Sequence, residues 1–196
     1  MRASNPIIVL TALAILAAGA ALVWRGGLST PAPPASDIGG PFHLTAENGA
    51  RVDEGVLKGK WTAVYFGYTF CPDVCPTTLA ALGEAEGDLG PKAKNFQVVF
   101  ITLDPARDTP AQMRTYLSSS SFPRGSIGLT GSAADIKAVA GAYHVYYSRH
   151  GDGPDYSVDH TSVVYLMDPE GRFVRPVASG PPADMAAQIA AAMSGK

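Results

Sequence analysis

The 196-residue chain has only two cysteines, and it lacks the common motifs for nucleotide binding and for hydrolytic catalysis. No GxGxxG, P-loop or nucleophile-elbow pattern occurs, which argues against a dinucleotide-binding enzyme, a P-loop NTPase and an α/β-hydrolase. No segment repeats another. The net charge of −2 provides no basic field, so nucleic acid is not an expected partner.

Charged residues are also scarce, at 16% of the chain against about 25% in an average soluble protein. Part of the reason is an uncharged apolar run at 7–24, IIVLTALAILAAGAALVW. As a helix this run would rise about 27 Å, close to the thickness of a hydrocarbon core. Arg2 precedes it, Arg25 follows it, and Trp24 stands where an interfacial aromatic would. We expect residues 1–25 to export the rest of the chain.

Two interpretations of that segment compete. A cleaved signal peptide usually has an apolar stretch of about 7–15 residues, and this run is longer, although small residues at Ala17, Gly19 and Ala21 would suit a peptidase. An uncleaved transmembrane helix is therefore favoured. Residues 26–41, GGLSTPAPPASDIGGP, are rich in proline and glycine and predict a semi-rigid linker. The folded domain is expected at 42–196.

Within that domain the pattern of apolar residues predicts an α/β fold. Strands are expected in a hairpin around 42–52 and at 61–67, 96–103, 161–167 and 173–177, with a short extended piece at 145–148; helices are expected at 77–89, 109–118, 132–143 and 182–193. This order fits a central mixed sheet, partly parallel and ending in an antiparallel hairpin, with flanking helices. That is the thioredoxin-like arrangement.

Cys71 and Cys75 lie between a predicted buried strand and a predicted helix, the position at which α/β sheets bind ligands. With three residues between them, their side chains can face the same way. Two such thiols can share a metal ion or form a disulfide, and helix N-terminal amides would lower a thiol pKa. Pro72 and Pro76 stiffen the loop. Two buried cysteines that act only as small hydrophobic residues are the simpler alternative.

A metal at this pair needs a third ligand, because two cysteines cannot complete a zinc site or hold an iron–sulfur cluster. Among the histidines, His160 stands directly before the predicted strand at 161–167. In a thioredoxin-like sheet the start of that strand lies beside the cysteine loop, where thioredoxins have a cis-proline. Two thiolates and one imidazole suit copper. The alternative is a structural histidine at the entry to the strand.

Two acidic residues adjoin these ligands. Asp73 could accept a hydrogen bond next to the metal ligands or simply begin the helix. Asp159 could hold His160 in one tautomer or be solvated.

Three segments resemble the signature blocks of the Sco/SenC family: YFGYTFCPDVCP, ITLDPARDTP and VDHTSVVYLMDPEGRF. Their order and spacing agree with that family from about residue 40 to the C-terminus, as does an apolar segment before a linker. The resemblance implies a thioredoxin fold and copper, as Cu(I) or Cu(II), bound by Cys71, Cys75 and His160. Phe70 stands where many members have histidine, so the surroundings of the ligands differ from theirs.

The resemblance also implies a metallochaperone that helps to assemble the dinuclear copper centre of cytochrome c oxidase. Its expected partners are the copper-receiving subunit of the oxidase, and another periplasmic copper carrier or a thiol reductase. The composition of the anchor and linker favours a bacterial inner-membrane protein with one N-terminal span and its domain in the periplasm.

Two enzymatic alternatives use the same cysteines. As a redox-active pair, Cys71 and Cys75 would reduce a disulfide of the copper-receiving subunit, a reaction that does not need His160. A peroxidase of the same fold is disfavoured. A resemblance to peroxiredoxins would require a threonine three residues before the reactive cysteine, and Tyr68 occupies that position here. The sequence leaves open whether the site passes on metal, electrons or both.

Overall fold

The computed structural model describes residues 37–195, which belong to one compact unit. The predicted anchor at 1–25, and the linker as far as residue 36, lie outside the described residues. Within 37–195, no helix has both the length and the apolar character needed to cross a membrane.

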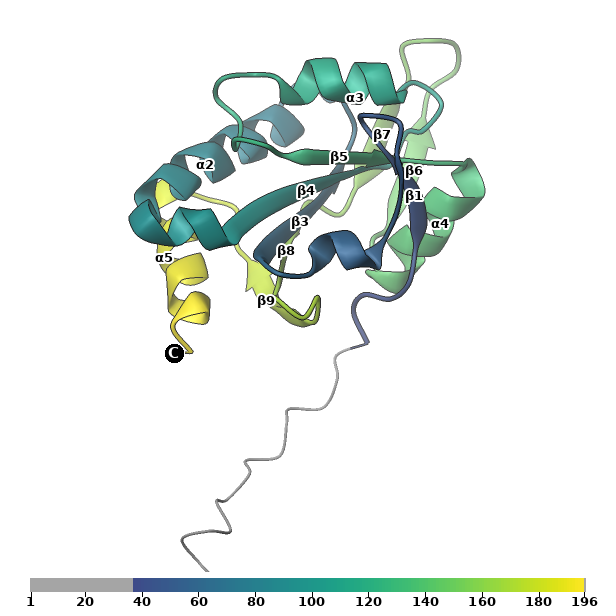
Figure 1. The fold of residues 1–196 in the computed structure, drawn as a ribbon. Coiled ribbons are helices and arrows are strands. Elements are labelled where there is room, and N and C mark those ends of the chain that lie inside the picture. The colour runs from purple at the N-terminus through teal and green to yellow at the C-terminus, as the bar shows by residue number, and fades with distance from the viewer. Residues whose placement is uncertain (1–36, 196) are drawn as a thin grey trace, which may run out of the picture. The chain divides into compact units, whose positions relative to one another are not determined.

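A seven-stranded mixed sheet forms the centre of the domain, in the order β2-β1-β5-β4-β3-β8-β9 (Figure 1). Its strands are β1 (His43–Ala46), β2 (Arg51–Asp53), β3 (Trp61–Gly67), β4 (Phe96–Thr102), β5 (Ile127–Thr130), β8 (Val164–Met167) and β9 (Phe173–Val177). β3, β4 and β5 are parallel, whereas β1, β8 and β9 pair antiparallel to their neighbours. The predicted mixed α/β sheet with a terminal antiparallel hairpin is therefore confirmed.

Helices flank this sheet, and a separate two-stranded sheet stands beside it (Figure 1). The α-helices are α2 (Val74–Asp88), α3 (Pro110–Leu117), α4 (Ala133–Ala142) and α5 (Pro182–Met193), and the short 3-10 helices are η1 (Glu54–Leu57) and η2 (Gly90–Asn95). The smaller sheet pairs β6 (Tyr147–His150) with β7 (Ser157–His160). We call this two-stranded hairpin, residues 147–160, the arm.

The hydrophobic core lies around β3 and β4, whose residues are almost all buried. Two central parallel strands are covered on both faces, which explains their unbroken apolar and β-branched sequences. The expected N-cap at Thr109 is confirmed, because its side chain accepts a hydrogen bond from the Gln112 amide at 3.2 Å.

Three boundaries differ from the sequence prediction, and one difference affects the candidate site. The helix expected at 77–89 begins at Val74, because a proline is tolerated in the first turn of a helix. The strand expected at 161–167 begins at Val164, and the extended piece at 145–148 is β6. His160 therefore does not stand directly before a strand of the central sheet, as predicted; it ends β7 of the arm.

Candidate metal centre

The two cysteines lie where β3 leads into α2. After Gly67 the chain turns, and the Cys71 amide donates to the Tyr68 carbonyl at 3.2 Å. Cys75 is in the first turn of α2, where backbone N–H groups have no partner within the helix. Its amide donates to the Cys71 sulfur at 3.4 Å, so the first turn of the helix holds the two cysteines together.

The sulfur atoms differ in their surroundings. Cys75 is fully buried and Cys71 half-buried, and neither forms a disulfide. Burial raises the pKa of Cys75 to about 12, because the thiolate loses its hydration. The expectation that the helix N-terminus lowers the thiol pKa is therefore wrong for Cys75. Its sulfur is a protonated thiol at neutral pH unless a cation replaces the proton.

His160 contacts Cys75 from the end of the arm. Its Nε2 atom lies 3.4 Å from the Cys75 sulfur, and its Nδ1 atom lies 3.1 Å from the Thr161 carbonyl oxygen. A carbonyl can only accept, so Nδ1 carries the proton and the lone pair of Nε2 faces the sulfur. Burial lowers the pKa of His160 and favours this neutral form.

Two aromatic rings pack beside the imidazole. The rings of Tyr65 and Tyr68 lie 6.4 and 6.1 Å from that of His160, both in edge-on geometry. Tyr65 belongs to β3 and Tyr68 follows that strand, so both come from the segment that leads into the cysteine loop. Both tyrosines are buried, so they place low-dielectric surface beside the imidazole, where electrostatic interactions are stronger. The sequence analysis assigned neither residue to the metal centre, because Tyr65 fits an apolar strand and Tyr68 was weighed only against the peroxidase pattern.

The chemical types of the donor atoms suit a soft metal ion, although the three side chains are not all at ligand distance from one point. In the region 37–195, no three His, Cys, Asp or Glu side chains are grouped as a formed metal site. The contact between Cys75 and His160 exists, and Cys71 is tied to the same helical turn through the Cys75 amide. Two sulfurs and one neutral imidazole nitrogen fit Cu(I) far better than magnesium or calcium.

The two acidic candidates make contacts away from the sulfurs. Asp73 precedes α2 without capping it, and its carboxylate accepts from the Thr77 hydroxyl at 3.4 Å. Asp159 is exposed and lies 3.2 Å from Nε2 of His150. The orienting contact of His160 that the structure contains is therefore with the Thr161 carbonyl.

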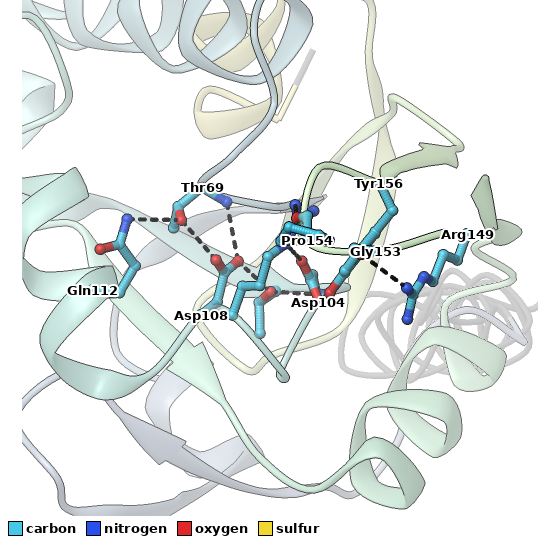
Figure 2. Close-up of polar contacts among 10 residues, drawn as sticks. Thr69, Asp104, Asp108, Gln112, Arg149, Gly153, Pro154 and Tyr156 are labelled. Atoms are coloured by element: carbon cyan, nitrogen blue, oxygen red, sulfur yellow. Dashed lines mark hydrogen bonds and ion pairs between the residues drawn. The ribbon is translucent and has the colours of Figure 1, made fainter. Parts of the chain in front are cut away.

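A buried carboxylate that the sequence analysis missed supports the cysteine loop. Asp108 accepts hydrogen bonds from the Thr69 amide at 3.0 Å and from the Thr69 hydroxyl at 2.6 Å (Figure 2). It also accepts one from the Thr102 hydroxyl at 2.6 Å. Burial raises its pKa, and these hydrogen bonds act in the opposite direction. Gln112 adds a bond to the Thr69 hydroxyl at 3.1 Å. The ITLDPARDTP segment could have been the signal, because it puts two carboxylates at the end of a buried strand.

This fold and this site define a thioredoxin-like protein with a thiol–imidazole pair at the carboxyl end of its central strands. The chain belongs to the SCO1/SenC family, whose sequence model matches residues 30–194.

Relatives and solved structures agree with that family. Mitochondrial SCO1 homolog 1 of Arabidopsis thaliana is 46% identical over 147 residues, which are 74% of this chain and 43% of that protein. A SCO2-like protein of Rickettsia conorii is 37% identical over 185 residues, which are 88% of this chain and 89% of the relative. The chain thus spans less than half of the plant protein but most of the bacterial one.

Two similar structures contain copper. ScoI of Bradyrhizobium japonicum with copper bound has a TM-score of 0.70 and 46% identity, and the match covers 78% of this chain and 97% of that one. Yeast Sco1 with copper bound has a TM-score of 0.74 and 38% identity, covering 81% of this chain and 90% of that one. These matches extend over nearly the whole described domain.

Proposed function

We propose that this chain binds copper through Cys71, Cys75 and His160 and delivers it during assembly of the dinuclear copper centre of cytochrome c oxidase. One observation carries the proposal: the Nε2 lone pair of His160 faces the Cys75 sulfur at 3.4 Å, while the Thr161 carbonyl holds Nδ1. An imidazole oriented in this way is ready to ligate a metal. Support also comes from the copper in the Bradyrhizobium and yeast structures and from membership of a family named for SCO1.

The chain's own residues divide the work of holding copper. The cysteines supply sulfur, and copper would take the place of their thiol protons. The Thr161 carbonyl keeps His160 in the tautomer that offers Nε2. The buried rings of Tyr65 and Tyr68 pack beside the imidazole. The receiving partner would be the oxidase subunit that contains the dinuclear centre.

An anaerobic Cu(I) titration of the full chain in detergent tests the ligand set. We expect about one copper per chain, and we expect His160→Ala to weaken binding by at least tenfold because one of three ligands is lost. His150→Ala is the matched control, since His150 pairs with the exposed Asp159 and should leave affinity unchanged. Unchanged copper stoichiometry and affinity in His160→Ala would show that His160 is not a ligand.

Thiol–disulfide exchange is the second candidate, and the two free cysteines of unequal exposure favour it. Deprotonated Cys71 would attack a partner disulfide, and Cys75 would then displace the partner sulfur. The products are a Cys71–Cys75 disulfide and two partner thiols. We expect this reaction to survive His160→Ala. Reduction of a peptide that carries the partner's two cysteines separates the candidates: full reduction by His160→Ala together with undiminished oxidase assembly would favour exchange.

We also propose that the apolar run at 7–24 anchors the domain on the periplasmic face of a bacterial inner membrane. The support is its length, its lack of charge and the flanking Arg2 and Arg25. Membrane fractionation, combined with labelling of Cys71 by a maleimide that cannot cross the inner membrane, tests this location. A domain that is labelled only after lysis would contradict it.

A further inference from the structure

The arm carries His160 and presents one face to the rest of the domain. Along β7, Val158 and His160 are buried or half-buried, while Ser157 and Asp159 are exposed, as alternation in a strand requires. Tyr156 continues the inward face in the opposite direction, about 13 Å from His160 at the usual rise per residue. The arm therefore has two inward contacts at its ends, Tyr156 and His160.

Arg107 lies between the Tyr156 end of the arm and the cysteine loop. Its guanidinium is 3.6 Å from the centroid of the Tyr156 ring, and its Nη1 donates to the Pro154 carbonyl at 3.1 Å. The same guanidinium lies 4.7 Å from the centroid of the Phe70 ring and 5.8 Å from that of Tyr68. One cation therefore contacts aromatic rings from both parts of the site.

The loop after β4 holds this arginine in place. Asp104, which is buried, forms an ion pair with Arg107. It also accepts a hydrogen bond from the Tyr156 hydroxyl (Figure 2). Asp108 belongs to the same loop and anchors Thr69 of the cysteine loop. The loop at 104–108 thus reaches the arm with one carboxylate and the cysteine loop with the other.

Apolar packing of the arm at Val158, which is buried in the core, leaves part of the gap between the arm and the domain open. A cavity of about 390 Å³ lies between them, lined on the arm by Tyr147 and Val158 and on the domain by Leu103, Pro105 and Ala133. The polar contacts at Tyr156 are therefore a main attachment of that end of the arm. Losing them would leave the arm held by buried Val158 and by the backbone hydrogen bond from the Thr161 amide to the Tyr146 carbonyl, and so would loosen the strand that ends in His160.

We infer that Arg107 is a positioning residue for the metal centre: by joining Tyr156 to Phe70 and Asp104, it keeps His160 at the cysteines. This inference deepens the proposed function and rests on it only in treating His160 as a ligand. Phe70 gains a role as a ring that faces this cation.

Arg107→Met in the full chain tests the inference, since methionine keeps an unbranched apolar stem like that of arginine and removes the guanidinium. We expect Cu(I) affinity to fall about ten- to a hundredfold, the usual effect of losing a group that orients a metal ligand. In the Cu(II) form we expect the nitrogen hyperfine signal of the imidazole to weaken. In the metal-free chain we expect amides of 147–160 to exchange at least tenfold faster, with 61–67 unchanged.

Arg149→Met is the matched control, because Arg149 lies 3.8 Å from the centroid of the same Tyr156 ring but hydrogen-bonds within the arm, to the Gly153 carbonyl (Figure 2). It should leave copper affinity within about twofold of wild type. Arg107→Lys, which keeps charge without the planar stacking group, should lie between wild type and Arg107→Met.

Wild-type copper affinity and wild-type exchange in Arg107→Met would overturn the inference. If that variant does not fold, Tyr156→Leu removes the other side of the contact. Copper affinity and amide exchange are then measured on Tyr156→Leu, and the same changes would support or overturn the inference. A wild-type chain that binds no copper would contradict the proposed function, and the metal-free exchange would still decide whether Arg107 holds the arm.

Discussion

Gly67 determines how closely the buried sulfur of Cys75 can approach the central sheet. A β-carbon at this position would lie 2.8 Å from that sulfur and 2.8 Å from Cε2 of Phe100. Real β-carbons do not come so close to other atoms, and Phe100 is fully buried, so neither neighbour can move away freely. The absence of a side chain at Gly67 therefore gives Cys75 its place beside β3.

We predict that Gly67→Ala lowers the free energy of unfolding by about 1–3 kcal/mol, the typical cost of overpacking a core. It should also weaken copper binding, because Cys75 is displaced from His160. Urea denaturation and a Cu(I) titration measure the two effects. Gly180→Ala is the control, since nothing lies within 4 Å of its β-carbon position. An unchanged unfolding free energy in Gly67→Ala would mean that the core accommodates the methyl group.

The candidate ligands could be predicted from sequence because their chemistry is unusual, whereas the groups that orient them could not. Asp159 precedes His160, yet strand alternation turns its carboxylate outward to His150. A backbone carbonyl, that of Thr161, takes the orienting position instead. Every residue has a carbonyl, so no residue type could reveal this contact in advance.

At the scale of elements, α2 contains two glycines in contrasting surroundings. A β-carbon at Gly83 would lie 2.3 Å from the Ser121 carbonyl oxygen, so the helix approaches the 121–123 segment directly. A β-carbon at Gly87, one turn further along, has nothing within 4 Å. The same substitution should therefore have opposite effects at these two positions.

We predict that Gly83→Ala destabilises the domain by about 1–3 kcal/mol, because α2 must move away from backbone atoms that cannot yield. Gly87→Ala should stabilise it by about 0.5–1 kcal/mol, since alanine loses less backbone entropy than glycine in a helix. Thermal unfolding of the wild type and the two variants measures the change in stability, which should be a decrease for Gly83→Ala and an increase for Gly87→Ala. Equal shifts in the same direction would refute the close contact at Gly83.

The main elements could be predicted because their apolar segments are long, whereas strands with short sequences, including β7 of the arm, could not. The runs at 61–67 and 96–103 are strands in the structure, as expected. β5 reads IGLT and β7 reads SVDH, and neither has the length or the regular apolar pattern that identifies a strand. Both depend on pairing with neighbouring strands, which is a tertiary effect. The sequence prediction therefore placed His160 beside the right loop, but directly before a strand of the central sheet instead of at the end of β7.

At the scale of the whole molecule, the site joins parts of the chain that are far apart in sequence. Cys75 and His160 are 85 residues apart, and they come from α2 and from the arm. A metal bound by both would act as a cross-link in the folded state that the unfolded chain lacks. The order of elements indicated a thioredoxin-like fold, but not that β1 would pair with β5, because that pairing joins distant strands.

We predict that Cu(I) at one hundred times its dissociation constant stabilises the full chain by about 2.7 kcal/mol, because copper binds the folded state. For a domain of this size that is a rise of about 5–10 °C in Tm. Differential scanning calorimetry with copper, and again after an excess of a Cu(I) chelator, measures the shift and its reversal. A Tm that copper does not change would contradict binding to the folded site.

The unequal burial of the two sulfurs gives the site a direction. Cys75 is fully buried, whereas Cys71 is half-buried beside Phe70, which is 50% exposed. An incoming donor atom would therefore meet a bound ion from the Cys71 side, and associative exchange would replace that bond before the one to Cys75. Entry and exit would share a single edge, so acquisition and handover would compete for the same approach and proceed one partner at a time.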